Sequence, residues 1–152
     1  GERDRIEIRP IELHDVIREL RGRFRSLVAN VGPLVDGAGE HMGLSRSVVG
    51  AADEVVGVGL GHPVSVSRTI AWSTAVTSLN PGAPQSILIN RAPKSVYRRG
   101  EIKLEVARAT GRAVEFLPSD ESVETASWVG RPVASGRFHR AVDRLVDRHP
   151  TW

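Results

Sequence analysis

The chain has 152 residues and a net charge of +3, with 40% hydrophobic but only 5% aromatic residues. It contains no cysteine, which excludes disulfides, thiolate zinc sites and cysteine nucleophiles. No apolar run approaches the ~20 residues that cross a bilayer, and no signal-peptide core follows the charged N-terminus, so we expect a cytoplasmic protein.

The first part of the chain alternates between extended and helical patterns. Residues 4–9 alternate polar and apolar, which predicts a short edge strand. Apolar residues at helical spacing predict an amphipathic helix over 11–23, and the apolar run 26–31 predicts a buried strand. A glycine-rich loop over 36–43 and a short helix over 44–51 follow.

The remainder continues the alternation of strands and helices. The predicted strands are 54–60, 86–90 and 113–117, and the predicted helices are 65–79 (capped by Ser65 or Ser67), 95–110, 121–129 and 136–148. Gly111 is the expected C-cap of one helix, and Ser119 or Asp120 the expected N-cap of another. Such alternation predicts a single α/β domain over 1–152, with a mostly parallel sheet and helices on both faces.

In an open parallel sheet, ligands bind outside the carboxyl ends of the strands. Turn-forming residues with a polar side chain follow each predicted strand, at 30–33, 59–63, 90–93 and 117–120. We therefore expect any functional site to lie where these segments meet.

Several short motifs occur along the chain in an order that is similar to that of a known protein family. An apolar run ends in Asn30 before Gly-Pro; then come Ala-Ala-Asp-Glu-Val-Val, His-Pro-Val-Ser, Ile-Leu-Ile-Asn-Arg, Leu-Pro-Ser-Asp and Gly-Arg-Pro. From about residue 11 onward, the chain resembles the C-terminal part of the MinD/ParA-type P-loop ATPases. The likeness is to the divergent CpaE/TadZ-like branch of pilus assembly and septum-site determination. It implies a partial P-loop NTPase-like fold without the phosphate-loop region.

The resemblance also implies site residues. Asn90 and Arg91 match the family's Asn-Arg, whose Asn pairs with the adenine edge, and Pro118 and Asp120 match a second adenine-flanking loop. Asn30 stands at a degenerate Walker B position, where the family has an Asp that orients the water shell of Mg²⁺. Each residue also has a local interpretation, because Asn at a strand end and Asp at a helix N-cap are common turn and cap residues.

The sequence lacks the motif that binds the phosphates of a nucleotide. There is no Gly-x-x-x-x-Gly-Lys-Ser/Thr motif, and neither lysine, Lys94 or Lys103, follows a glycine. We expect no catalytic residues and no cofactor in this chain alone. The leading hypothesis is a non-catalytic module that positions a division, partitioning or pilus/secretion apparatus through protein contacts. The alternative is part of an active ATPase that uses ATP and Mg²⁺ and has its phosphate loop upstream of residue 1.

The resemblance implies an apolar seam between 26–31 and 54–60, where the family has its phosphate-loop strand, and we expect upstream sequence or a second copy of the chain to fill it. The expected partners are therefore other proteins or a second copy of the chain. Nucleic acid is not expected, because the 19 arginines are interspersed with Asp and Glu. Membrane contact by the last helix is a rival interpretation, but its apolar stripe favours packing on the sheet. Three further alternatives are weaker. The histidines lack the spacing of metal ligands, and a catalytic triad of Ser65, His62 and Asp36 lacks the nucleophile elbow. A response-regulator-like domain would need a cluster of carboxylates at the strand ends, which the sequence does not have.

Overall fold

The computed structural model describes residues 10–32, 34 and 40–148. Its elements are α1 (Pro10–Arg23), α2 (Glu40–Ala51), β1 (Val55–Leu60), α3 (Pro63–Leu79), β2 (Gln85–Ala92), α4 (Val96–Thr110), β3 (Val114–Pro118), α5 (Glu121–Trp128) and α6 (Gly136–Arg148). The predicted edge strand 4–9 and Asp36 lie outside the described residues.

Three strands form one sheet in the order β1-β2-β3, and both pairs are parallel. Val55 lies beside Gln85, and Ile87 lies beside Val114. Helix α3 connects the first pair and α4 the second, as parallel neighbours require. The predicted α/β class with a parallel sheet is confirmed.

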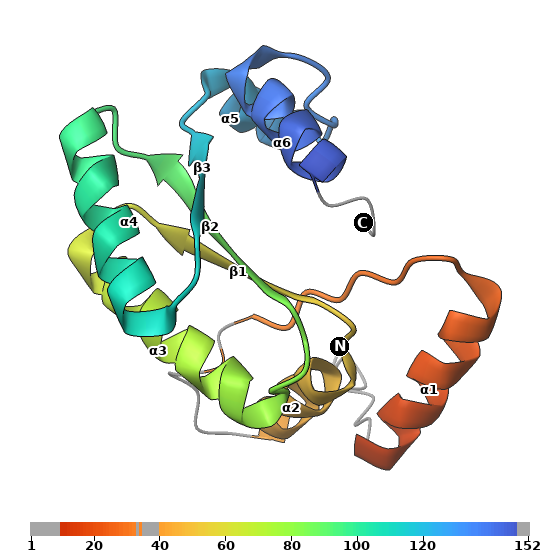
Figure 1. Ribbon diagram of the computed structural model, residues 1–152. Coiled ribbons are helices and arrows are strands. Elements are labelled where there is room, and N and C mark those ends of the chain that lie inside the picture. The colour runs from red at the N-terminus through yellow and green to blue at the C-terminus, as the bar shows by residue number, and fades with distance from the viewer. Residues whose placement is uncertain (1–9, 33, 35–39, 149–152) are drawn as a thin grey trace.

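Helices α3 and α4 cover one face of the sheet (Figure 1). Ile87 and Ile89 of β2 are buried against residues of both helices. The buried partners are Val66, Ile102, Val106 and, from β3, Val114. These β-branched side chains fill the layer without a fully buried aromatic, as the low aromatic content requires.

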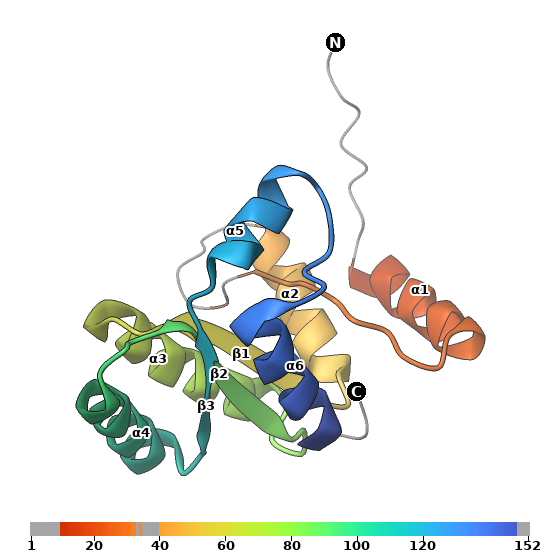
Figure 2. The same cartoon turned by 90° about the horizontal axis from the view of Figure 1, so that it is seen from above.

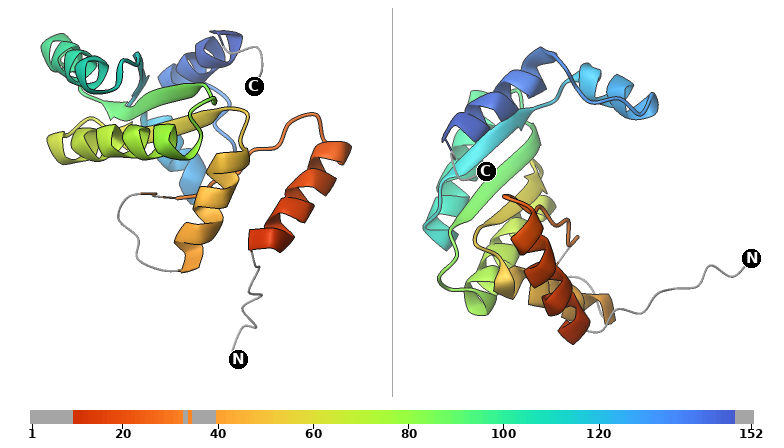
Figure 3. Two further views of the ribbon diagram at one scale, coloured as in Figure 1. Left: turned by 60° about the horizontal axis from the view of Figure 1, so that its bottom comes forward. Right: turned by 90° about the vertical axis from the view of Figure 1, so that its right-hand side faces the viewer.

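Helix α6 covers the opposite face over β2 and β3 (Figure 3). Ala141 and Leu145 are buried against Leu88 and Leu117. The prediction that the last helix packs on the sheet is confirmed, and helices lie on both faces.

Helix α3 approaches β1 closely because β1 has two glycines on that face. The ring of Trp72 packs over Gly57, and the hydroxyl of Thr69 lies over Gly59. A side chain at either glycine would collide with these groups. The glycines therefore serve close helix–strand packing.

The predicted strand 26–31 is wrong. Ser26–Val31 has no ladder partner among the described residues, and the side chain of Val28 is 94% exposed. A strand exists only through hydrogen bonds to a neighbour. An apolar run cannot reveal whether a neighbour is within reach.

Two helix starts also differ from the predictions. Helix α3 begins at Pro63, with His62 as N-cap instead of Ser65 or Ser67. Proline has no N–H and suits the first helical position, and the Nδ1 of His62 accepts the N–H of Ser65 at 3.3 Å. Helix α2 begins at Glu40, so the end of the predicted glycine-rich loop is helical.

Candidate functional site

The carboxyl ends of β2 and β3 lie side by side. Ala92 and Pro118 are Cα partners at the end of this pair, beyond an irregularity in the register. Asn90 and Arg91, in the last residues of β2, therefore lie beside the end of β3, where Pro118 is the last strand residue and Asp120 follows two positions later. The structure brings together the two loops that the resemblance assigns to the adenine side.

Asn90 closes its own turn. Its half-buried side chain accepts the backbone N–H of Arg91 through Oδ1 at 2.8 Å. Arg91 has φ +50°, a left-handed conformation that is uncommon for residues other than glycine, and its side chain is exposed. The amide nitrogen of Asn90 supplies the donors that contact with a base edge requires.

Asp120 holds two helix starts at once. Its carboxylate accepts the N–H of Ser122 at 3.0 Å, at the start of α5, and the N–H of Phe138 at 2.9 Å, in the first turn of α6. Gly136, at φ +104°, leaves room for the carboxylate of Asp120, because a Cβ on residue 136 would lie only 2.6 Å from Oδ2 of Asp120. The bonds from Phe138 and Ser122 lower the pKa of Asp120 to about 2.

The loop after β1 is also closed locally. The backbone N–H of Leu60 donates to the hydroxyl of Ser65 at 2.7 Å, in the first turn of α3. A Cβ on Gly61 would lie 2.5 Å from the ring of Pro93, so the loops after β1 and β2 touch. This role of Ser65 was not predicted from the sequence, although its spacing behind His62-Pro63 was an available signal.

Asn30 does not stand at a strand end, because no strand forms there. Its side chain accepts the N–H of Gly32 at 3.3 Å, which makes it a turn cap. It lies in the wall of a large cavity, away from Asn90 and Asp120, which are not among the lining residues.

That cavity has a volume of about 1460 Å³ and lies between α1, residues 24–32, α2 and β1. We call it the β1 groove. Its walls are mostly apolar: Leu13, Val16, Ile17 and Leu20 of α1, Phe24, Leu27 and Val28 of the following segment, and Val55, Val56 and Val58 of β1. Helix α1 packs on α2 and stands apart from the α3–α4 layer (Figure 2).

The second face of β1 is only partly covered. Val56, Val58 and Leu60 are 39%, 63% and 39% exposed, whereas Leu88 of the neighbouring strand is 7% exposed beneath α6. Of the 14 exposed large hydrophobic side chains of the described residues, six belong to β1 or to residues 24–32: Val56, Val58, Leu60, Phe24, Leu27 and Val28.

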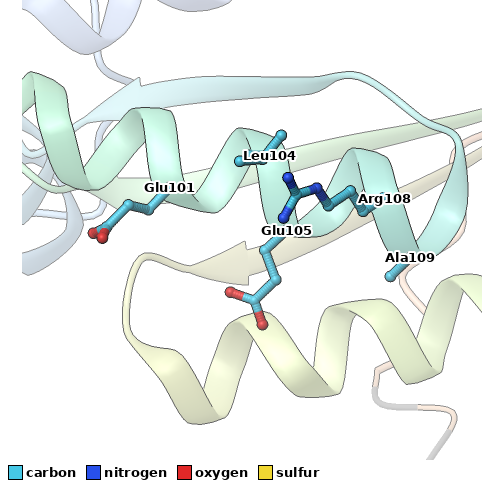
Figure 4. Close-up of a pocket in the computed structure, with 5 residues that line it drawn as sticks. All are labelled: Glu101, Leu104, Glu105, Arg108 and Ala109. Atoms are coloured by element: carbon cyan, nitrogen blue, oxygen red, sulfur yellow. The ribbon is translucent and has the colours of Figure 1, made fainter.

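A second, shallow hollow of about 380 Å³ lies on the outer surface of α4 (Figure 4). Its lining residues all come from this one helix: Glu101, Leu104, Glu105, Arg108 and Ala109. A single helix face cannot surround a ligand, so this hollow is a weaker candidate.

Among the described residues, no group of three or more His, Asp or Glu side chains is arranged to hold a metal ion. Within the same part of the chain, none of the helices combines the length and apolarity that crossing a membrane requires.

Comparison with models of known protein families gives no match to this chain, and comparison with curated protein sequences gives no significant match.

Proposed function

We propose that this chain is a MinD/ParA-like module that works through protein contacts in the cytoplasm and does not hydrolyse ATP on its own. It corresponds to the C-terminal portion of such a domain and acts in positioning a division, partitioning or pilus/secretion apparatus. The proposal rests on the order of motifs along the sequence together with the shape of the sheet.

The contrast between the strand ends and the β1 groove favours a function through protein contacts. The polar residues at the strand ends are engaged locally, since Asn90 binds the N–H of Arg91 and Asp120 binds two helix N-termini. The apolar β1 groove, in contrast, lies open beside an edge strand. Exposed apolar surface beside an unpaired strand edge favours association with protein.

The pairing of the two adenine-side loops supports a residual nucleotide site. Asn90, Arg91, Pro118 and Asp120 would flank a base, but the described residues include no lysine-bearing phosphate loop. We therefore expect weak or no binding of ATP and Mg²⁺, and no turnover.

The test is a phosphate-release assay with ATP and Mg²⁺, run beside a titration calorimetry experiment. We expect no release above a protein-free control. Release that disappears in Asn90→Ala would contradict the proposal and favour the ATPase alternative. Asn90 is suited to this purpose because it lies at the paired ends of β2 and β3 and bonds only its neighbour Arg91 in the described structure, while Ser78→Ala on α3 is a matched surface control.

A further inference from the structure

Helix α4 has an outer face that nothing in the described chain covers. Ile102 and Val106 are buried beneath the helix, against the sheet and α3. Each residue turns an α-helix by about 100°, so the side opposite these two carries Tyr97, Glu101, Leu104 and Arg108. We call these four residues the α4 outer face. All four are exposed, Tyr97 by 75% and Leu104 by 51%, and no described element lies over this side of the helix (Figures 1 and 2).

The hollow on α4 has the form of a hole for one side chain. Four of its five lining residues, Glu101, Leu104, Glu105 and Arg108, stand at positions i, i+3, i+4 and i+7 of the helix (Figure 4). Four residues at this spacing form the hole that receives one side chain of a facing helix when two helices pack together. A hollow that is too open for a small ligand therefore suits a helix from another chain.

The charged groups around this hole have no partners in their own chain. Among the described residues, the side chains of Glu101, Glu105 and Arg108 take part in no ion pair and no hydrogen bond. Glu101 and Arg108 lie seven residues apart, which is about 10 Å along the helix. One acid and one base at this separation complement an identical surface that runs in the opposite direction, because each acid then meets a base.

Charge and shape together select one arrangement of two copies. In a parallel pair, Glu101 would face Glu101 of the other copy, and such like charges repel. In an antiparallel pair centred at Leu104, each Glu101 lies opposite Arg108 of the other copy, and each Leu104 reaches the hole of the other helix. Tyr97 then lies over Gly111 of the other copy, which has no side chain and has open space around it.

We propose that the chain forms a two-fold symmetric dimer in which two α4 helices pack antiparallel through the α4 outer face. The partner is a second copy because this face is complementary to itself. With 15 residues, α4 is about 22 Å long, so the contact lies at the small end of specific interfaces and the dimer is weak. This inference goes beyond the proposed function and is independent of it, so the phosphate-release assay and the experiments below fail separately.

Sedimentation velocity over a series of protein concentrations tests the dimer itself. We expect a reversible monomer–dimer equilibrium that high salt weakens, because salt screens exposed ion pairs. Leu104→Glu places two carboxylates at the centre and should weaken the dimer by about tenfold or more, whereas Val129→Glu on the exposed end of α5 should leave it unchanged. A monomer at every concentration, or a dimer that Leu104→Glu leaves intact, would overturn the proposal.

Charge exchange tests the direction of the pair. Glu101→Arg alone and Arg108→Glu alone each set like charges against one another, so each variant should dimerise about tenfold more weakly than the parent. A mixture of the two variants should form a heterodimer, because one copy then carries two bases and the other carries two acids. The double variant should dimerise like the parent. A mixture that stays monomeric would overturn the antiparallel arrangement.

Because the chain contains no cysteine, single introduced thiols report the register of the pair. A short bismaleimide should join Glu101→Cys to Arg108→Cys in a mixture of these variants, and Leu104→Cys to itself. Glu101→Cys alone should react several-fold less, because the two copies of residue 101 lie about 10 Å apart along the helix axes. Val129→Cys controls for random collision, and circular dichroism checks that each variant is folded. Strong self-linking of Glu101→Cys would indicate a parallel pair and overturn the proposal.

Discussion

The carboxylate of Asp120 accepts the backbone N–H of Phe138, 18 residues further along the chain, at 2.9 Å. The same side chain caps α5 through Ser122, so one residue fixes the starts of two helices. Because α6 covers the second face of the sheet, this bond connects the end of β3 to the placement of that cover.

Asp120→Asn should make the stability of the fold less dependent on pH in the acid range. The pKa of Asp120 is lowered from 3.8 to about 2 in the folded protein. The stabilisation is therefore complete above pH 4 and is lost as pH falls through about 2. The melting temperature of the variant should lie below that of the parent at pH 7, and the gap should close between pH 4 and 2. A constant gap over this range would show that the carboxylate charge is not responsible.

Gly57→Ala should destabilise the fold. The new Cβ would collide with the ring of Trp72, which must then move within a packed layer. We expect a loss of about 1–3 kcal/mol in the free energy of unfolding, measured in urea. Gly100→Ala in α4 is the control: nothing lies within 4 Å of a Cβ there, so it should raise stability by roughly 0.5–1 kcal/mol.

Leu145→Ala tests the packing of α6. Leu145 is 3% exposed against Leu88 and Leu117, so truncation should cost about 2–5 kcal/mol in unfolding free energy. Val146, next in the chain, is 44% exposed, and Val146→Ala should cost far less. Equal effects of the two changes would contradict the placement of α6, and lost liposome binding with unchanged stability would favour a membrane role for this helix.

Asn80→Asp should loosen the contact between α2 and α3. The amide nitrogen of Asn80 donates to the carbonyls of Val49 and Ala52 at 3.0 and 2.9 Å. A carboxylate there would face the same carbonyl oxygens without a proton to donate. We expect a loss of about 1–3 kcal/mol in urea unfolding, and little change for Ser78→Ala nearby.

Local signals in the sequence predicted most elements. Gly111, the predicted C-cap, ends α4 in a left-handed conformation, and Asp120, one of the two predicted N-caps, begins α5 by accepting the N–H of Ser122; both caps are confirmed. Apolar β-branched runs likewise located β1, β2 and β3 to within two residues. The caps are satisfied by neighbours in the sequence, whereas the three strands also found ladder partners about 30 residues away.

The remaining features depend on contacts that spacing does not contain. Residues 26–31 are apolar enough for a strand, yet no ladder partner lies beside them in the described chain. The second bond of Asp120, to Phe138, joins two segments that no local pattern connects. The adenine-side residues Asn90 and Pro118 were placed at one edge by topology alone, and their role in nucleotide binding stays a prediction.

The order of strands in the sheet, β1-β2-β3, is also their order along the chain. Each strand thus pairs with its sequence neighbour across a single helix, and within the described residues no later segment inserts between two strands that are already paired. Folding can proceed as two overlapping β–α–β closures that share β2, each over a short loop with a small entropic cost. Because Ile87 and Ile89 belong to both closures, β2 is the strand whose disruption would halt assembly from either direction.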